Sequence, residues 1–112
     1  HNVENVTCAV DCGVAVNPDV IAAQMEGGIG FGLSPALMSE ITFEKGKVVQ
    51  SNFHDYSVIR MPQMPAVAVH IVPSNEHPTG VGEPAVPVIA PALANALFAS
   101  GVGPLRRLPF KL

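Results

Sequence analysis

Alternating apolar and polar residues predict a strand near the start of the chain and another in its second half. Residues 3–11 alternate weakly, so that Val6, Cys8 and Val10 would share one face of a strand. Residues 66–72 alternate cleanly, with valine and isoleucine on one face and smaller or polar side chains on the other. We therefore expect two half-buried strands.

The middle of the chain predicts a hairpin. Residues 39–43 and 48–53 are strand-like, and they flank the turn sequence Glu44-Lys45-Gly46-Lys47. Residues 56–64 show no regular period, and prolines break the segment. We expect this segment to be irregular.

Asn17-Pro18-Asp19 predicts the start of a helix. Asparagine is a preferred N-cap, proline suits the first helical position, and an acid in the first turn complements the helix dipole. The helix is predicted to run from Pro18 into the region of Leu33, with Pro35 ending it.

Four glycines lie in this predicted helix, at positions 27, 28, 30 and 32. Each interior glycine costs about 0.5–1 kcal/mol relative to alanine. A dinucleotide-binding loop would need its glycines between a strand and a helix start, but this helix starts ten residues earlier. We therefore expect a backbone or a bulky ligand to pack closely against the glycine face.

The uncharged stretch from Ala85 to Leu105 predicts a second helix. It would begin at Pro84 or Ala85 and end near Ser100, with Gly101 capping it and Pro91 bending it. Its prolines and its alanine-rich composition favour a buried helix over a membrane span. The element order is β-α-β-β-β-α, which predicts an α+β fold with a mixed sheet and two main helices, forming a single domain over residues 1–112.

Charged residues make up only 13% of the chain, where about 25% is typical. Such a surface indicates either self-association or, as we prefer, a piece of a larger protein whose other parts cover the apolar faces. The net charge of −3 argues against a nucleic-acid partner. The only basic cluster, Arg106-Arg107 with Lys111, is interpreted as a solvated tail.

Other candidate groups carry less weight. Cys8 and Cys12 are interpreted as buried free thiols, since no further metal ligands lie in sequence range. The pair His54-Asp55 would point to opposite faces of a strand, which favours structural roles. No hydrolase or P-loop motif occurs.

Glu83 is the strongest candidate for chemistry. In the sequence Gly80-Val81-Gly82-Glu83-Pro84 a carboxylate lies between a flexible turn and an apolar helix start. The helix dipole favours its charged form and burial favours its protonated form, a balance suited to a general base. Gln24, just before the glycines, offers a donor and an acceptor for the edge of a heterocycle.

Three motifs together resemble the C-terminal part of the molybdenum-binding subunit of the xanthine dehydrogenase and aldehyde oxidase family. They are Asp11 to Pro18, then Gln24-Met25-Glu26-Gly27-Gly28 with Gly32-Leu33, then Gly80 to Pro84. The segments 51–56 and 106–110 are most similar to the bacterial isoquinoline 1-oxidoreductase β-subunit branch. The resemblance covers nearly the whole chain.

The resemblance implies an enzyme that hydroxylates an aldehyde or a carbon of an N-heterocycle, with oxygen taken from water. It implies Glu83 as general base and Gln24, Gly80, Val81 and Gly82 beside a molybdopterin cofactor, with no direct metal ligand in this chain. In bacterial members the cofactor is usually molybdopterin cytosine dinucleotide, and two-iron–two-sulfur clusters lie on a partner chain.

Family subunits are several times longer than 112 residues, so the resemblance implies a C-terminal fragment that forms one layer of a larger molybdopterin-binding subunit. Its partners would be the rest of that subunit and an iron–sulfur subunit. We expect the isolated fragment to hold no cofactor, to be inactive and to self-associate. The alternatives are a non-enzymatic assembly domain with a charge-poor docking surface and, less favoured, a small dinucleotide-binding module.

Overall fold

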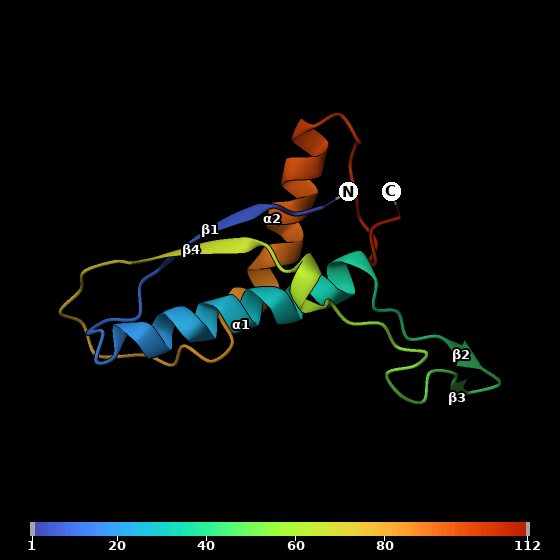
Figure 1. Cartoon of the computed structure of the whole chain (residues 1–112), viewed down its shortest axis with the longest axis horizontal. Coiled ribbons are helices and arrows are strands. Elements are labelled where there is room, and N and C mark those ends of the chain that lie inside the picture. The colour runs from blue at the N-terminus through green and yellow to red at the C-terminus, as the bar shows by residue number, and fades with distance from the viewer. Residues whose placement is uncertain (1, 112) are drawn as a thin grey trace.

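The computed structural model describes residues 2–111. Two helices, four short strands and one 3-10 turn follow one another along the chain (Figure 1). In order, they are β1 (Asn5–Val10), α1 (Pro18–Leu37), β2 (Phe43–Glu44), β3 (Lys47–Val48), η1 (Met61–Gln63), β4 (Ala66–Ile71) and α2 (Ala85–Ala99). The predicted order of elements and the α+β class are confirmed.

The strands form two separate sheets and not one mixed sheet. β1 pairs with β4 in parallel, with Asn5 opposite Ala66 and Val10 opposite Ile71. β2 pairs with β3 antiparallel, on an arm that extends away from the rest of the chain (Figure 1). The two sheets cannot merge because the arm places β2 and β3 far from β1 and β4.

α1 begins as predicted but ends later than predicted. The Val20 N–H donates a hydrogen bond of 3.2 Å to the Asn17 side chain, which caps the helix. The helix continues through Pro35 to Leu37, so the expectation that proline would end it was wrong. Proline removes only one backbone donor, and burial of Ala36, which is fully inaccessible, holds the last turn in place.

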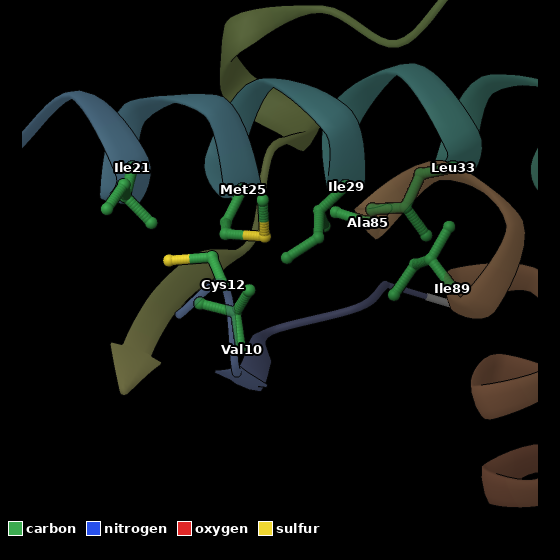
Figure 2. Packing of buried hydrophobic residues seen from close by; sticks show 8 residues of the cluster. All are labelled: Val10, Cys12, Ile21, Met25, Ile29, Leu33, Ala85 and Ile89. Carbon is green, nitrogen blue, oxygen red and sulfur yellow. The ribbon is translucent and has the colours of Figure 1, made fainter. Parts of the chain in front are cut away.

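The core lies where one face of α1 covers β1, the residue Cys12 and the start of α2 (Figure 2). Side chains four residues apart along α1 point to this core, and β1 contributes Val10, as its predicted alternation requires. The buried cluster comprises Val10, Cys12, Ile21, Met25, Ile29, Leu33, Ala85 and Ile89.

The α1 glycines let α2 approach α1 closely, which confirms the expected close packing. A Cβ atom at Gly28 would lie 2.9 Å from the Cβ of Ala85. At Gly32 it would lie 2.5 Å from a methyl group of Ile89 and 2.6 Å from the Val86 carbonyl oxygen. Any side chain at these two positions would push the helices apart.

α2 matches its prediction closely. It spans Ala85–Ala99, contains Pro91 and is followed by Gly101, whose φ is +95°. None of the helices in residues 2–111 is long and apolar enough to cross a bilayer.

The arm that carries β2 and β3 has a tighter turn and shorter strands than predicted. Lys45 and Gly46 have φ values of +49° and +78°, as a two-residue hairpin turn requires. Each strand is only two residues long, because no other element formed by residues 2–111 covers the arm. Its base is hydrogen-bonded to the end of α1 and to the residues that follow it. Ser34 Oγ, in the last turn of α1, accepts from the Ile59 N–H at 3.0 Å, and Ser39 Oγ, just after the helix, donates to the Ser57 carbonyl at 2.6 Å.

The chain is more open than a self-sufficient domain of its size. Its radius of gyration is 16.1 Å, against about 13 Å for a compact domain of this length. Its solvent-accessible surface is 7797 Å², against about 5900 Å² expected for a monomer of this mass. Large apolar side chains are exposed over the arm and both helices, among them Phe31, Phe43, Phe53, Met61 and Phe98.

The openness predicts association of the isolated chain. We expect residues 1–112, purified alone, to form dimers or larger assemblies at crystallographic concentrations, because exposed apolar surface is removed from water on contact. Sedimentation velocity over a range of concentrations measures this. A single monomeric species at the highest concentration would contradict it.

Candidate functional site

A groove of about 720 Å³ lies between α1 and the start of α2. One wall comes from α1 and the other from the loop that leads into α2 together with the first turn of α2. The lining residues are Gln24, Gly27, Gly28, Phe31, Gly82, Glu83, Pro84, Val86 and Pro87. The two residues singled out for chemistry, Gln24 and Glu83, therefore line one cavity although 59 positions separate them in the sequence.

The α1 wall is a single stripe of the helix. Gln24, Gly27, Gly28 and Phe31 are spaced i, i+3, i+4 and i+7, which places them on one face. Gly28 belongs to this stripe and also contacts α2. A Cβ atom at Gly27 would meet nothing within 4 Å. The floor of the groove is therefore bare backbone that a flat group could approach.

The opposite wall is held in place by contacts on both sides of Glu83. Before it, the Thr79 N–H donates to the Cys12 carbonyl at 2.9 Å, and Val81 packs against the core cluster. After it, Ala85 is buried against Gly28. Glu83 lies between these two fixed points, so its backbone position follows from the core packing.

The turn at Gly13 contacts the start of the loop that carries Glu83. Gly13 has a φ of +71°, and a Cβ there would collide with the carbonyl oxygens of His77 and Glu76. The Val14 N–H also donates to the Glu76 carbonyl at 3.0 Å. The Asp11-Cys12-Gly13 segment therefore anchors the loop that carries Glu83.

Glu83 is exposed, and the expectation that it would be buried was wrong. Pro84 and Pro87 are also exposed, Val81 and Val86 are partly buried, and only Ala85 in this stretch is buried. Within residues 2–111, no cationic side chain lies within ion-pair distance of it. Its carboxylate faces a groove that this chain leaves open to water on one side.

The structure places some of the other predicted cofactor-binding residues at the groove and others outside it. Gly82 lines the groove, and a Cβ built on it would lie 3.9 Å from Gln24 Nε2 across the gap. Gly80 is exposed and Val81 packs on the core, and neither lines the groove. Gln24 is exposed at the groove, with its amide free for a ligand as far as the described residues show.

Phe31, Val86 and Pro87 line the groove and were not singled out from the sequence. Phe31 is 72% exposed, which is high for a phenylalanine. Helical spacing from Gln24 could have indicated Phe31, whereas Val86 and Pro87 required knowledge of how α2 crosses α1. Phe31, Val86 and Pro87 give the groove apolar surface, whereas Gln24 and Glu83 give it polar groups.

The remaining candidate groups lie outside the groove. Backbone N–H groups of Asn52 and Ser51 donate to the Asp55 carboxylate and hold its pKa below the usual range, and His54 lies 3.5 Å away. Asp55 therefore closes a turn in the arm. Both cysteines are free: Cys12 is buried, and burial raises the pKa of the half-buried Cys8 thiol.

The chain is similar in sequence to a family model and to known enzymes. Residues 1–65 match the family model of a molybdopterin cofactor-binding domain. The chain is 46% identical over 111 residues to isoquinoline 1-oxidoreductase subunit beta of Brevundimonas diminuta. It is 35% identical over 108 residues to the membrane-bound aldehyde dehydrogenase (pyrroloquinoline-quinone) of Gluconacetobacter polyoxogenes. These matches cover 98% and 96% of this chain.

The fold is also similar to that of a solved structure. Quinoline 2-oxidoreductase from Pseudomonas putida 86 superposes with a TM-score of 0.76 over 88% of this chain, at 21% sequence identity. The chain spans only 14% of the length of that protein and of both sequence relatives. In each of them, the matching unit is a small part of a much longer polypeptide.

Proposed function

Because this chain belongs to the family of molybdopterin cofactor-binding domains, we propose that it forms one wall of the cofactor site in a molybdenum hydroxylase large subunit. The full subunit would hydroxylate an aldehyde or a carbon of an N-heterocycle. The observation that carries the proposal is the single groove that joins Gln24, the bare surface at Gly27 and Glu83.

The residues of the groove fit a flat, polar cofactor. Gly27 leaves open space where any other residue would project a side chain, so a planar ring system could lie on the backbone. Gln24 supplies a donor and an acceptor at the same wall. Gly82 keeps the facing loop free of side chains, and Gly80 and Val81 would act by shaping that loop.

When bound, the molybdenum cofactor supplies the two-electron redox chemistry of hydroxylation. This chain's own contribution is the carboxylate of Glu83, whose Oε atoms would accept the proton released in the reaction. Glu83 lies just before the first residue of α2, at the N-terminal end of that helix. Remaining segments of the subunit would close the groove over it and exclude water.

The isolated chain would be inactive and would hold no cofactor. The groove between its two walls stays open to solvent on one side, so the other cofactor contacts and the substrate channel would come from the rest of the subunit. Two-iron–two-sulfur clusters on a partner subunit would take up the electrons. A cytosine dinucleotide form of the cofactor is our preferred assignment.

Molybdenum content tests this proposal. We expect the purified full-length subunit to contain molybdenum and residues 1–112 alone to contain none. Gln24→Leu should lower the cofactor affinity of the full-length subunit about two- to tenfold, the range for loss of one neutral hydrogen bond. Elemental analysis during stepwise dialysis measures the retention.

Ala23→Leu is the matched control, since Ala23 is the preceding exposed residue of α1 and lies outside the groove. It introduces the same side chain and should retain molybdenum at the wild-type level. Equal loss in both variants would point to damage of α1 and not to a lost contact. Absence of molybdenum from the wild-type full-length subunit would contradict the proposed function itself.

A further inference from the structure

The C-terminal segment carries a charge pattern that the groove does not use. All nine acidic residues lie within residues 1–83, together with three of the six cationic residues. Residues 84–112 contain the other three cations and no acid. The chain is therefore acidic over its first three-quarters and basic at its end.

The basic segment is anchored and does not hang free. Phe110 is 7% exposed and packs with Ala36 and Leu97 in a second core cluster. Its N–H donates to the Ala36 carbonyl at 2.8 Å, which ties the segment to the last turn of α1. The three cations are exposed to solvent, as the sequence interpretation expected, but the segment that carries them is anchored and is not a free tail.

The anchored segment presents its three cations around one hollow. A pocket of about 260 Å³ is lined by Arg106, Arg107 and Lys111, with Pro104, Leu105 and Pro109 between them. All three cations are exposed. Among residues 2–111, no carboxylate lies within 4.0 Å of any of them. We call these six residues the basic pocket.

An apolar surface adjoins the basic pocket. A second hollow of about 190 Å³ shares Pro104, Leu105 and Arg106 with it and adds Phe98 from α2. Phe98 is 60% exposed and Leu108, within the segment, is 45% exposed. Arginine beside an exposed aromatic ring is typical of protein docking surfaces, whose centres are rich in these residue types.

We propose that the basic pocket and Phe98 dock an acidic segment of the remaining part of the same large subunit. This rests on the proposed function, which makes the chain part of such a subunit. The matching unit is 14% of the length of its relatives, so most of the subunit lies outside it and must cover its apolar surface. The apolar hollow beside the basic pocket favours a polypeptide over a free phosphate, which would gain nothing from contact with Phe98.

Lys111 can report the contact directly. A carbodiimide joins a lysine amine to a carboxylate only when the two groups touch, and it adds no spacer. In the full-length subunit, we expect a Lys111 cross-link to an aspartate or glutamate outside residues 1–112, identified by mass spectrometry. Raising the salt concentration to 1 M should weaken the cross-link, since it screens the exposed charges.

Charge reversal then tests the two arginines. Arg106→Glu with Arg107→Glu leaves Lys111 in place, and should lower the yield of the Lys111 cross-link at least about fivefold. Lys45→Glu with Lys47→Glu reverses two exposed charges on the arm, and should leave that yield unchanged. The cross-link in the unmodified protein needs no variant to fold, so the proposal does not depend on stability of the double variant.

Several outcomes would overturn the proposal. Absence of a Lys111 cross-link, a link to a separate subunit, or a link between differently isotope-labelled copies would each exclude an intrasubunit contact. Saturable binding of inorganic phosphate, lost in the arginine variant and without a Lys111 cross-link, would identify a small-anion site instead. The molybdenum content of the same sample tests the proposed function separately. The docking contact can be absent from a subunit that contains molybdenum, and it can be present in a subunit that contains none.

Discussion

Replacing Glu83 by glutamine in the full-length subunit is expected to lower kcat by about 10²–10⁴-fold, the usual contribution of a positioned proton-transfer group. Glutamine keeps the shape of the side chain at the groove but cannot accept a proton. Because the groove keeps its lining residues, cofactor content should stay close to that of the wild type. Single-turnover kinetics together with molybdenum analysis measures the two effects separately.

Glu76→Gln provides the control for this substitution. Glu76 is an exposed carboxylate of the same loop and does not line the groove, so its neutral variant should turn over normally. A Glu83→Gln enzyme with full cofactor and unchanged kcat would remove the proposed proton-transfer role. If that variant instead lost subunit association while keeping its rate, the alternative of an assembly domain would be favoured.

Two glycines of α1 should respond to alanine with opposite signs. At Gly32 the new methyl group would meet Ile89 at 2.5 Å and the Val86 carbonyl at 2.6 Å. Overpacking of this kind costs about 1–3 kcal/mol, which outweighs the helix-propensity gain of about 0.5–1 kcal/mol. A Cβ atom at Gly27 would meet nothing within 4 Å. Alanine there should therefore stabilise the fold by the helix-propensity gain of about 0.5–1 kcal/mol.

Thermal unfolding, monitored by circular dichroism, measures the Tm of the Gly27→Ala and Gly32→Ala variants. A change of 1 kcal/mol corresponds to roughly 4–8 °C for a domain near this size, so the two Tm values should separate on either side of the wild type. A Gly32→Ala protein as stable as the wild type would mean that α2 does not press on α1 as closely as the structure shows.

The predictions that held were those set by neighbouring residues. The cap at Asn17, the alternation of β1 and β4, and the stop of α2 before Gly101 all depend on a few adjacent positions. Local backbone preferences act over about one turn or one strand, so the sequence carries this information directly. Glu83 was singled out the same way, from its position between glycines and a helix start, and its role in proton transfer stays a prediction.

Predictions that depended on distant neighbours were less secure. Pro35 was expected to end α1, but burial of Ala36 against the C-terminal segment keeps the helix going. The strands of the arm were expected to be longer, but no other element of residues 2–111 packs over them. Glu83 was expected to be buried, but the described part of the chain leaves it exposed.

The sequence by itself determined the elements, their order, the close packing at the glycines and the residues worth testing. Only the tertiary structure decided that Gln24 and Glu83 line one groove, that Phe31 and Pro87 share it, and that Arg106, Arg107 and Lys111 surround a pocket. The physical reason is the distance along the chain over which each interaction acts. Helix caps and hydrophobic periodicity depend on residues close in the sequence, whereas the groove forms only when α2 packs on the bare backbone of Gly28 and Gly32.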